Sequence, residues 1–146
     1  MARFLIVGGG CRGLRLARAL RAEGHAARVT TRDPGRRSAI AAAGAEAVVA
    51  DPDRIGTLRD ALDGVTVLLW LLGTVDDEAL HGPRWRMMLE RTIDTTVRGV
   101  VYERGTDAGA ALTRELATFN GIPHAVVDAR AADWLGETRA AIARLL

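Results

Sequence analysis

The chain has 146 residues, enough for one domain with a single hydrophobic core. Hydrophobic residues make up 49% of it, which excludes the disordered and fibrous classes. No apolar run approaches the roughly 20 residues of a membrane-spanning helix. The single cysteine, Cys11, excludes an intrachain disulfide and fits a reducing compartment. We therefore expect a cytoplasmic protein without a membrane partner.

The charge pattern is distinctive because every one of the 20 basic residues is an arginine. A sequence pI of about 9.4 is typical of many nucleic-acid-binding domains. However, 18 acidic residues are interspersed with the arginines and the net charge is only +2, which argues against nucleic acid as a partner. The absence of lysine restricts the catalytic chemistry that is open to the chain.

The predicted elements alternate between strands and helices. A hydrophobic tetrad at residues 4–7 predicts a buried strand, and apolar residues at helical spacing predict a helix at 14–23. Further strands are predicted at 26–31, 45–50, 65–72, 97–103 and 123–128. Further helices are predicted at 36–43, 54–62, 83–96, 107–120 and 131–146, with a loop at 73–82.

This alternation predicts an α/β fold, because a helix between successive strands is the usual crossover of a parallel sheet. We expect a single doubly wound Rossmann domain over residues 1–146. Its six-stranded parallel sheet would have the order 3-2-1-4-5-6, with helices on both faces. No residues are then left over for a separate substrate domain.

A glycine-rich motif follows the first predicted strand. Residues 8–13 fit G-x-G-x-x-G between a buried strand and an amphipathic helix, the context in which this pattern indicates dinucleotide binding. Gly8 permits the tight turn, Gly10 lets the backbone approach a pyrophosphate, and Gly13 lets the helix pack closely on the sheet. Cys11 and Arg12 complete this loop at the helix N-terminus, where free N–H groups bind anions. The alternative is a purely structural turn.

The end of the second predicted strand indicates which dinucleotide is bound. An NAD site commonly has an acidic residue there, whereas this strand ends in Thr30 and Thr31 and is followed by Arg32. A guanidinium suits a ribose 2′-phosphate because its planar fork can bind two oxygens. We therefore predict NADP(H), bound by Arg32 with support from Arg36. Two alternatives stay open: these arginines coat a surface loop, or Asp33 binds the ribose of NAD(H).

Three segments carry a resemblance to a known family. Residues 24–34 (GHAARVTTRDP), residues 44–46 (GAE) with Asp51, and residues 58–65 (LRDALDGV) resemble the atypical short-chain dehydrogenase/reductase group, which includes the NmrA-like NAD(P)-binding proteins. The resemblance covers residues 3–72, and 97–102 more loosely. It implies that Asp51, with Pro52, lies against the adenine, and that Leu72 and Gly73 line the cofactor. One departure is Val7, where extended members have an additional glycine.

The catalytic residues of the wider group are missing. Its reductases use a Tyr-x-x-x-Lys pair to move a proton, whereas this chain has no lysine and its only tyrosine, Tyr102, lies inside a predicted strand. Glu103 and Arg104 occupy the place where the resemblance implies Ser or Thr. Glu103 is a candidate general base, with a salt bridge to a neighbouring arginine as the alternative. We expect His81 to be an exposed loop residue and find no spacing that indicates a metal site.

These observations leave three functions open. The first is an NADP-dependent oxidoreductase of the atypical short-chain type, acting on an unknown small molecule. The second is a non-catalytic dinucleotide-binding module that senses redox state, which the missing catalytic residues favour. The third is a regulatory domain like those that control potassium transport, against which Arg32 counts.

An apolar stripe on the predicted helix at 83–96 is expected to cover the sheet; if it were exposed, it would make a homodimer interface. The stripe consists of Trp85, Met88, Leu89 and Ile93.

Overall fold

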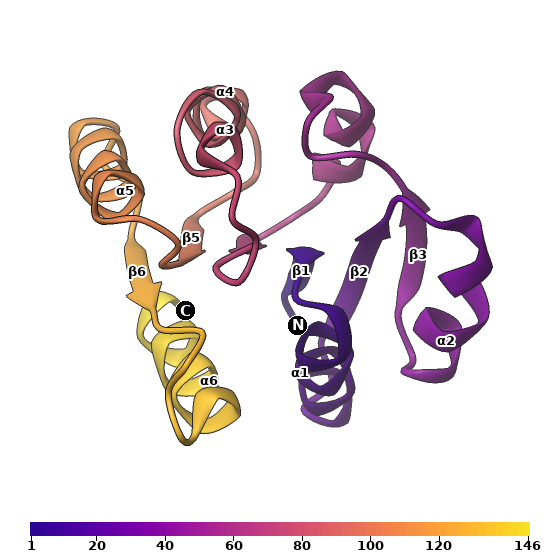
Figure 1. Ribbon diagram of the computed structural model, residues 1–146. Helices are drawn as coiled ribbons and strands as arrows, with labels where there is room; N and C mark the ends of the chain where they lie inside the picture. Colours follow the sequence, from indigo (N-terminus) through magenta and orange to yellow (C-terminus); the bar gives the residue numbers. More distant parts are fainter.

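The computed structural model describes residues 1–146 and contains one six-stranded, all-parallel sheet in the order β3-β2-β1-β4-β5-β6 (Figure 1). This order confirms the predicted Rossmann topology. From β1 to β3 each new strand is added on one side of β1, whereas β4, β5 and β6 are added on the other side. The topological switch point therefore lies between β1 and β4, where Gly8 at the end of β1 pairs with Leu71 at the end of β4. The strands are β1 (Arg3–Gly8), β2 (Ala26–Thr31), β3 (Glu46–Val49), β4 (Val67–Leu71), β5 (Gly99–Glu103) and β6 (His124–Val127).

Helices cover both faces of the sheet (Figure 1). On one face lie α1 (Gly10–Ala22), α2 (Arg37–Ala42) and α6 (Trp134–Leu145). On the other lie α4 (Pro83–Thr92), α5 (Asp107–Phe119) and the short 3-10 helices η2 (Ile55–Leu58) and η3 (Asp60–Leu62). Every residue of β4 is buried, as expected for a central strand that is covered on both faces.

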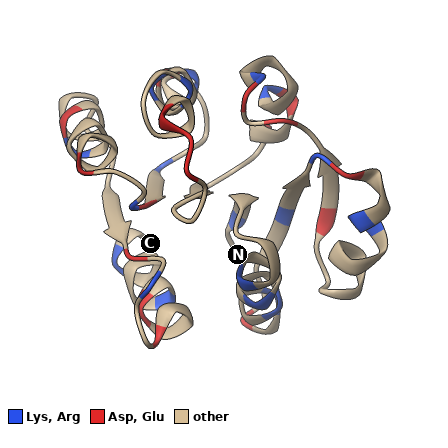
Figure 2. Ribbon diagram, viewed as in Figure 1, with Lys and Arg blue, Asp and Glu red and all other residues tan.

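Charged residues are spread over this frame. Figure 2 shows arginines and acidic residues on helices of both layers, in keeping with their interspersed order in the sequence. None of the helices is long and apolar enough to cross a lipid bilayer.

The sheet separates two hydrophobic cores, and the one beneath α4 and α5 contains an aromatic stack. Trp85 lies between Trp70 and Tyr102, with ring centroids 5.0 and 5.7 Å from its own. The indole N–H of Trp70 donates to the carbonyl of Leu80, and that of Trp85 donates to the hydroxyl of Thr113. Both buried indoles are therefore fully satisfied, as their burial requires.

The predicted helix at 54–62 was wrong, because this segment forms η2 and η3 instead. The hydroxyl oxygen of Thr57 lies 3.0 and 2.7 Å from the carbonyl oxygens of Asp51 and Arg54, which share its one proton, and it accepts from the N–H of Asp51. Such local side-chain bonds compete with the helical pairing of the backbone.

Other predicted bounds also differ from the structure. The predicted loop at 73–82 contains the short helix α3 (Glu78–His81), whose N-terminus is capped by the carboxylate of Asp77 accepting from the N–H of Ala79. The predicted helix at 36–43 begins as the 3-10 helix η1 (Pro34–Arg36). The predicted helix at 83–96 ends at Thr92, and beyond it Asp94 adopts a φ of 64°, which a right-handed helix does not allow.

The apolar stripe of α4 covers the sheet as predicted. Trp85, Met88 and Leu89 are buried, whereas Ile93 lies beyond the helix end and is 39% exposed.

The aromatic stack yields a prediction about stability. Trp85→Ala should lower the free energy of unfolding by about 3–5 kcal/mol, because it opens a cavity between two rings and leaves the Thr113 hydroxyl without its donor. Met87→Ala on the same helix is the control, since Met87 is 40% exposed and should shift the value by no more than about 0.5 kcal/mol. Urea denaturation measures both variants, and equal effects would contradict the assignment of the core to this stack.

Candidate functional site

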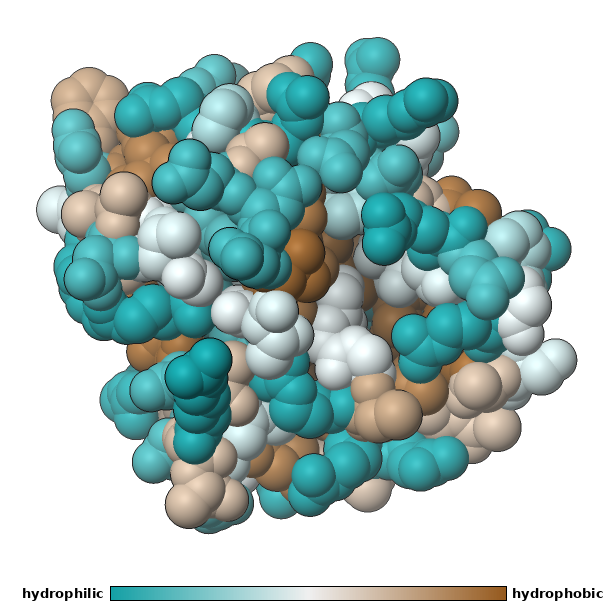
Figure 3. Space-filling model, in the orientation of Figure 1, coloured by the Kyte–Doolittle hydropathy of each residue, from teal (hydrophilic) through white to brown (hydrophobic).

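A cavity of 720 Å³ opens at the carboxyl edge of the sheet, where β1, β2 and β4 end. Its walls come from the β1–α1 loop, the β2–η1 turn, the end of β3 and the loop after β4. Figure 3 shows this face of the molecule hollowed near its middle, with hydrophobic surface inside the hollow. Ligands of open α/β sheets bind at this kind of place, beyond the carboxyl ends of the strands at the switch point.

The glycine motif forms one wall of the cavity. Gly8, Gly9 and Gly10 have φ values of 82°, 87° and 53°, a region that residues with a side chain rarely adopt. A Cβ on Gly8 would lie 2.7 Å from the carbonyl oxygen of Leu71, and one on Gly13 would lie 2.8 Å from that of Gly8. A Cβ on Gly10, by contrast, would meet no atom within 4 Å. Gly8 and Gly13 are therefore required by close packing, whereas Gly10 borders open space.

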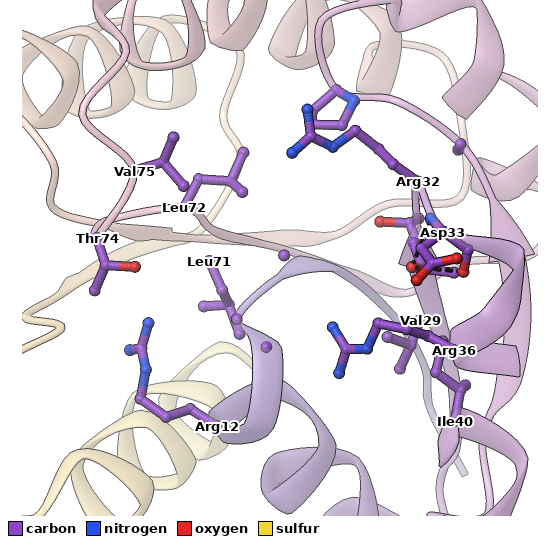
Figure 4. A pocket seen from close by; sticks show the side chains of 17 residues that line it. Arg12, Val29, Arg32, Asp33, Arg36, Ile40, Leu71, Leu72, Thr74 and Val75 are labelled. Carbon is purple, nitrogen blue, oxygen red and sulfur yellow. Dashed lines mark hydrogen bonds between the residues drawn. The ribbon is translucent and has the colours of Figure 1, made fainter. Parts of the chain in front are cut away.

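The opposite wall carries two arginines. Arg32 follows β2 and Arg36 ends η1, and Figure 4 shows both across the cavity from Arg12. Asp33 lies between them, and its Oδ1 accepts from the N–H of Gly35 at 2.8 Å, which caps η1. The hydroxyl of Thr31 bonds to the backbone of Asp33 and so fixes this turn.

Most of the predicted cofactor residues lie together around the cavity: Gly8, Gly10, Arg12, Thr31, Arg32, Arg36, Pro52 and Leu72. Four others do not line it. Cys11 is exposed, Gly13 packs against β1, and Gly73 donates to a buried carboxylate. The carboxylate of Asp51 accepts from the N–H of Asp53 at 2.9 Å.

Sequence reasoning missed several hydrophobic lining residues, among them Val29, Ile40, Ala50 and Val75. The first three have the composition of core residues, and the only signal for them is their position near the carboxyl ends of β2 and β3 or on the helix that follows. Val75 lies in a loop whose path the sequence does not predict.

Glu103 ends β5 and is completely buried. Its carboxylate accepts from both terminal nitrogens of the Arg12 guanidinium, from the N–H of Gly73 at 2.8 Å and from the indole N–H of Trp134 at 2.8 Å. The guanidinium also lies over the Trp134 ring, 5.0 Å from its centroid. The salt bridge that the sequence left open as an alternative is therefore present, and four donors occupy both carboxylate oxygens.

His81 is buried, so the prediction of an exposed loop residue was wrong. The formation of α3 turns its ring inward, where Nδ1 lies 2.8 Å from the Tyr102 hydroxyl and Nε2 lies 3.0 Å from the carbonyl oxygen of Val75. Because a carbonyl only accepts, we assign the ring proton to Nε2, and the Tyr102 hydroxyl then donates to Nδ1. The same hydroxyl accepts from the N–H of Gly105 at 3.3 Å. The pair thus holds the loop that carries Val75 along the cavity.

Comparison with known proteins agrees with this architecture. Residues 8–138 match the model of a family described as NAD(P)H-binding. No curated protein matches the chain. A putative short-chain dehydrogenase/reductase from Corynebacterium glutamicum is 18% identical, with a TM-score of 0.68 over 96% of this chain and 89% of that one.

Two further solved structures share the fold. Triphenylmethane reductase from Citrobacter sp., complexed with NADP(H), is 21% identical, with a TM-score of 0.65 over 94% of this chain and 54% of that one. An NADPH-dependent quinone oxidoreductase from Escherichia coli is 20% identical, with a TM-score of 0.58 over 84% of this chain and 46% of that one. The chain spans about half the length of several reductase and epimerase chains that it matches. At these identities the likeness is one of fold.

The packing of the glycine motif yields a second prediction. Gly13→Ala should destabilise the fold by about 1–3 kcal/mol, although alanine favours helices, because its Cβ would overlap the Gly8 carbonyl. Gly56→Ala is the matched control, since a Cβ there meets no atom within 4 Å. It should leave stability within about 0.5 kcal/mol. Thermal and urea unfolding measure both, and a neutral Gly13→Ala would contradict the close contact between α1 and β1.

Proposed function

Because the chain belongs to the NAD(P)H-binding family, we propose that the cavity binds a nicotinamide dinucleotide, with NADP(H) preferred, and that the protein reduces a small molecule by hydride transfer. One observation carries this proposal: at the switch point, a glycine loop with open space above Gly10 faces Arg32 and Arg36 across a single cavity. A pyrophosphate fits the first wall and a ribose phosphate the second.

The preference for NADP(H) is supported by the lack of acidic partners for two arginines of the cavity. Neither Arg32 nor Arg36 forms a salt bridge with an acidic side chain, so both guanidinium groups are free to bind an anion. Asp33, the residue that would favour NAD(H), already uses one carboxylate oxygen to cap η1. Two unpaired cations beside one partly engaged carboxylate favour a 2′-phosphate over a 2′-hydroxyl.

The reaction is constrained by the ionisable side chains of the cavity. Three of the four ionisable side chains that line it are arginines, which do not give up a proton in proteins, and the fourth, Asp33, lies at the β2 wall. Tyr102, Glu103 and His81 are buried, and their hydrogen-bonding groups are engaged by other protein groups.

We therefore infer that the substrate accepts a hydride without a proton from the protein. Quinones and flavins are of this class, because their conjugated rings hold the added electron pair until water supplies the proton. NADPH would give its hydride to the acceptor and leave as NADP⁺, and the reduced anion would then be protonated by solvent. The cofactor supplies the difficult chemistry, and the chain orients it.

A non-catalytic dinucleotide-binding module is the second candidate. The composition of the cavity favours it, because a lining whose ionisable side chains are mainly arginines also suits a protein that binds the cofactor without turnover.

Thermal unfolding tests the cofactor. NADPH at about 100 times its Kd should add roughly 2.7 kcal/mol to the stability and raise Tm by several degrees, more than NADH does. Arg32→Ala should abolish the difference between NADPH and NADH, whereas Arg37→Ala should keep it. Arg37 is the matched control because it is an exposed neighbour that does not line the cavity. Equal shifts with NADPH and NADH in the unmodified protein would overturn the NADP preference.

Turnover tests the reaction. Oxidation of NADPH, followed by the loss of its absorbance, should be faster with a quinone or flavin than with a simple ketone of similar size, since only the ketone needs an acid. Saturable NADPH binding without oxidation by any acceptor would replace the reductase with the non-catalytic module. Faster reduction of the ketone would show that a proton donor reaches the site.

A further inference from the structure

Arg12 differs from the other two arginines of the cavity because it is anchored. It lies in the first turn of α1, two residues after Gly10, and Figure 4 shows its guanidinium across the cavity from Arg32 and Arg36. Arg32 and Arg36 form no salt bridge, whereas Arg12 is bound on one edge by the buried carboxylate of Glu103.

Stability alone does not explain the buried ion pair between Arg12 and Glu103. Glu103 is completely buried at the end of a hydrophobic strand, and a carboxylate in such a place requires full compensation by donors. It has four of them, yet buried ion pairs of this kind can often be replaced by well-packed hydrophobic residues without loss of stability. The fold alone therefore does not demand an ion pair at this position.

The geometry leaves part of Arg12 available. A guanidinium has five N–H donors, and Glu103 accepts one from each terminal nitrogen. Trp134 supports one face of the guanidinium, while 24% of the Arg12 side chain stays exposed and lines the cavity. Since the carboxylate offsets its charge and fixes its orientation, Arg12 presents a rigid set of remaining donors rather than a mobile cation.

Glu103 also fixes the wall beside Arg12. Its Oε1 accepts from the N–H of Gly73, which lies between the lining residues Leu72 and Thr74. A Cβ on Gly73 would lie 2.6 Å from Cγ of Glu103, so the loop approaches the carboxylate as closely as glycine alone permits. One buried carboxylate thus sets the position of both the Arg12 guanidinium and the loop after β4.

We propose that Glu103, together with Trp134, is a positioning residue that holds Arg12 as a ligand for the pyrophosphate of the bound dinucleotide. This inference rests on the proposed function, since it assigns the part of the dinucleotide that each wall binds. Arg12 and the open backbone at Gly10 bind the pyrophosphate, and Arg32 and Arg36 bind the ribose phosphate. Prior fixation of Arg12 spares the bound state the cost of ordering a long side chain.

The test separates binding from folding. Arg12→Met alone leaves Glu103 buried without its cation and should lower Tm. The double variant Arg12→Met/Glu103→Gln removes both charges and leaves an amide oxygen that can accept from the N–H of Gly73, so it should recover much of that Tm, yet bind NADPH at least tenfold more weakly than the unmodified protein. Glu103→Gln, which keeps Arg12 but weakens its anchor, should lose several-fold in NADPH affinity. Arg15→Met, an exposed arginine of the same helix, is the control and should leave NADPH affinity unchanged.

A fragment locates the effect within the cofactor. Adenosine 2′-monophosphate carries the 2′-phosphate but no pyrophosphate, so titration should give the same Kd for the double variant and the unmodified protein. Equal NADPH affinity of these two proteins would overturn the inference while leaving the proposed function intact. If the KM for the hydride acceptor were raised at the same time, Arg12 would be assigned to the substrate instead. No NADPH binding by the unmodified protein would instead remove the proposed function itself.

Discussion

The close approach of α1 to the ends of β1 and β4 is the constraint on which the site depends. Gly13 packs against the carbonyl of Gly8, and Gly8 in turn leaves no room for a side chain beside Leu71 and Leu72. This contact fixes the start of α1 directly above the switch point of the sheet. The same contact therefore sets the positions of the cavity-wall residues in the first turn of α1, including Gly10 and Arg12.

The charges around the cavity are divided by how they are held. On the β2 side, Arg32 and Arg36 have no acidic partner and lie on a short turn, so they can adjust to an anion. On the α1 side, Arg12 is fixed by a buried carboxylate and an indole. A cavity with one rigid side and one adaptable side suits a long anionic ligand. The rigid side fixes the position of the ligand along the cavity, and the adaptable side accommodates its variable group.

The sequence predicted the elements whose signal is local and repeated. Strand order followed from the alternation of buried strands with helices, and the motif at residues 8–13 predicted both the turn and the cavity wall. The partners in contacts across long sequence separations were not predicted. The inward position of His81 depends on Tyr102, 21 residues away, and the salt bridge that the sequence left open for Glu103 has Arg12, 91 residues away, as its partner. Composition gave no sign that the segment containing Thr57 would form 3-10 turns.

The two polar residues at the end of β5, Tyr102 and Glu103, are both held by other protein groups. The ring of Tyr102 stacks on Trp85 in the core. Its hydroxyl donates to His81, which in turn holds the loop that carries Val75. Glu103 is occupied by four donors from three separate segments. Neither side chain is among those that line the cavity. The end of β5 therefore contributes to the cavity by fixing Arg12 and the loop after β4.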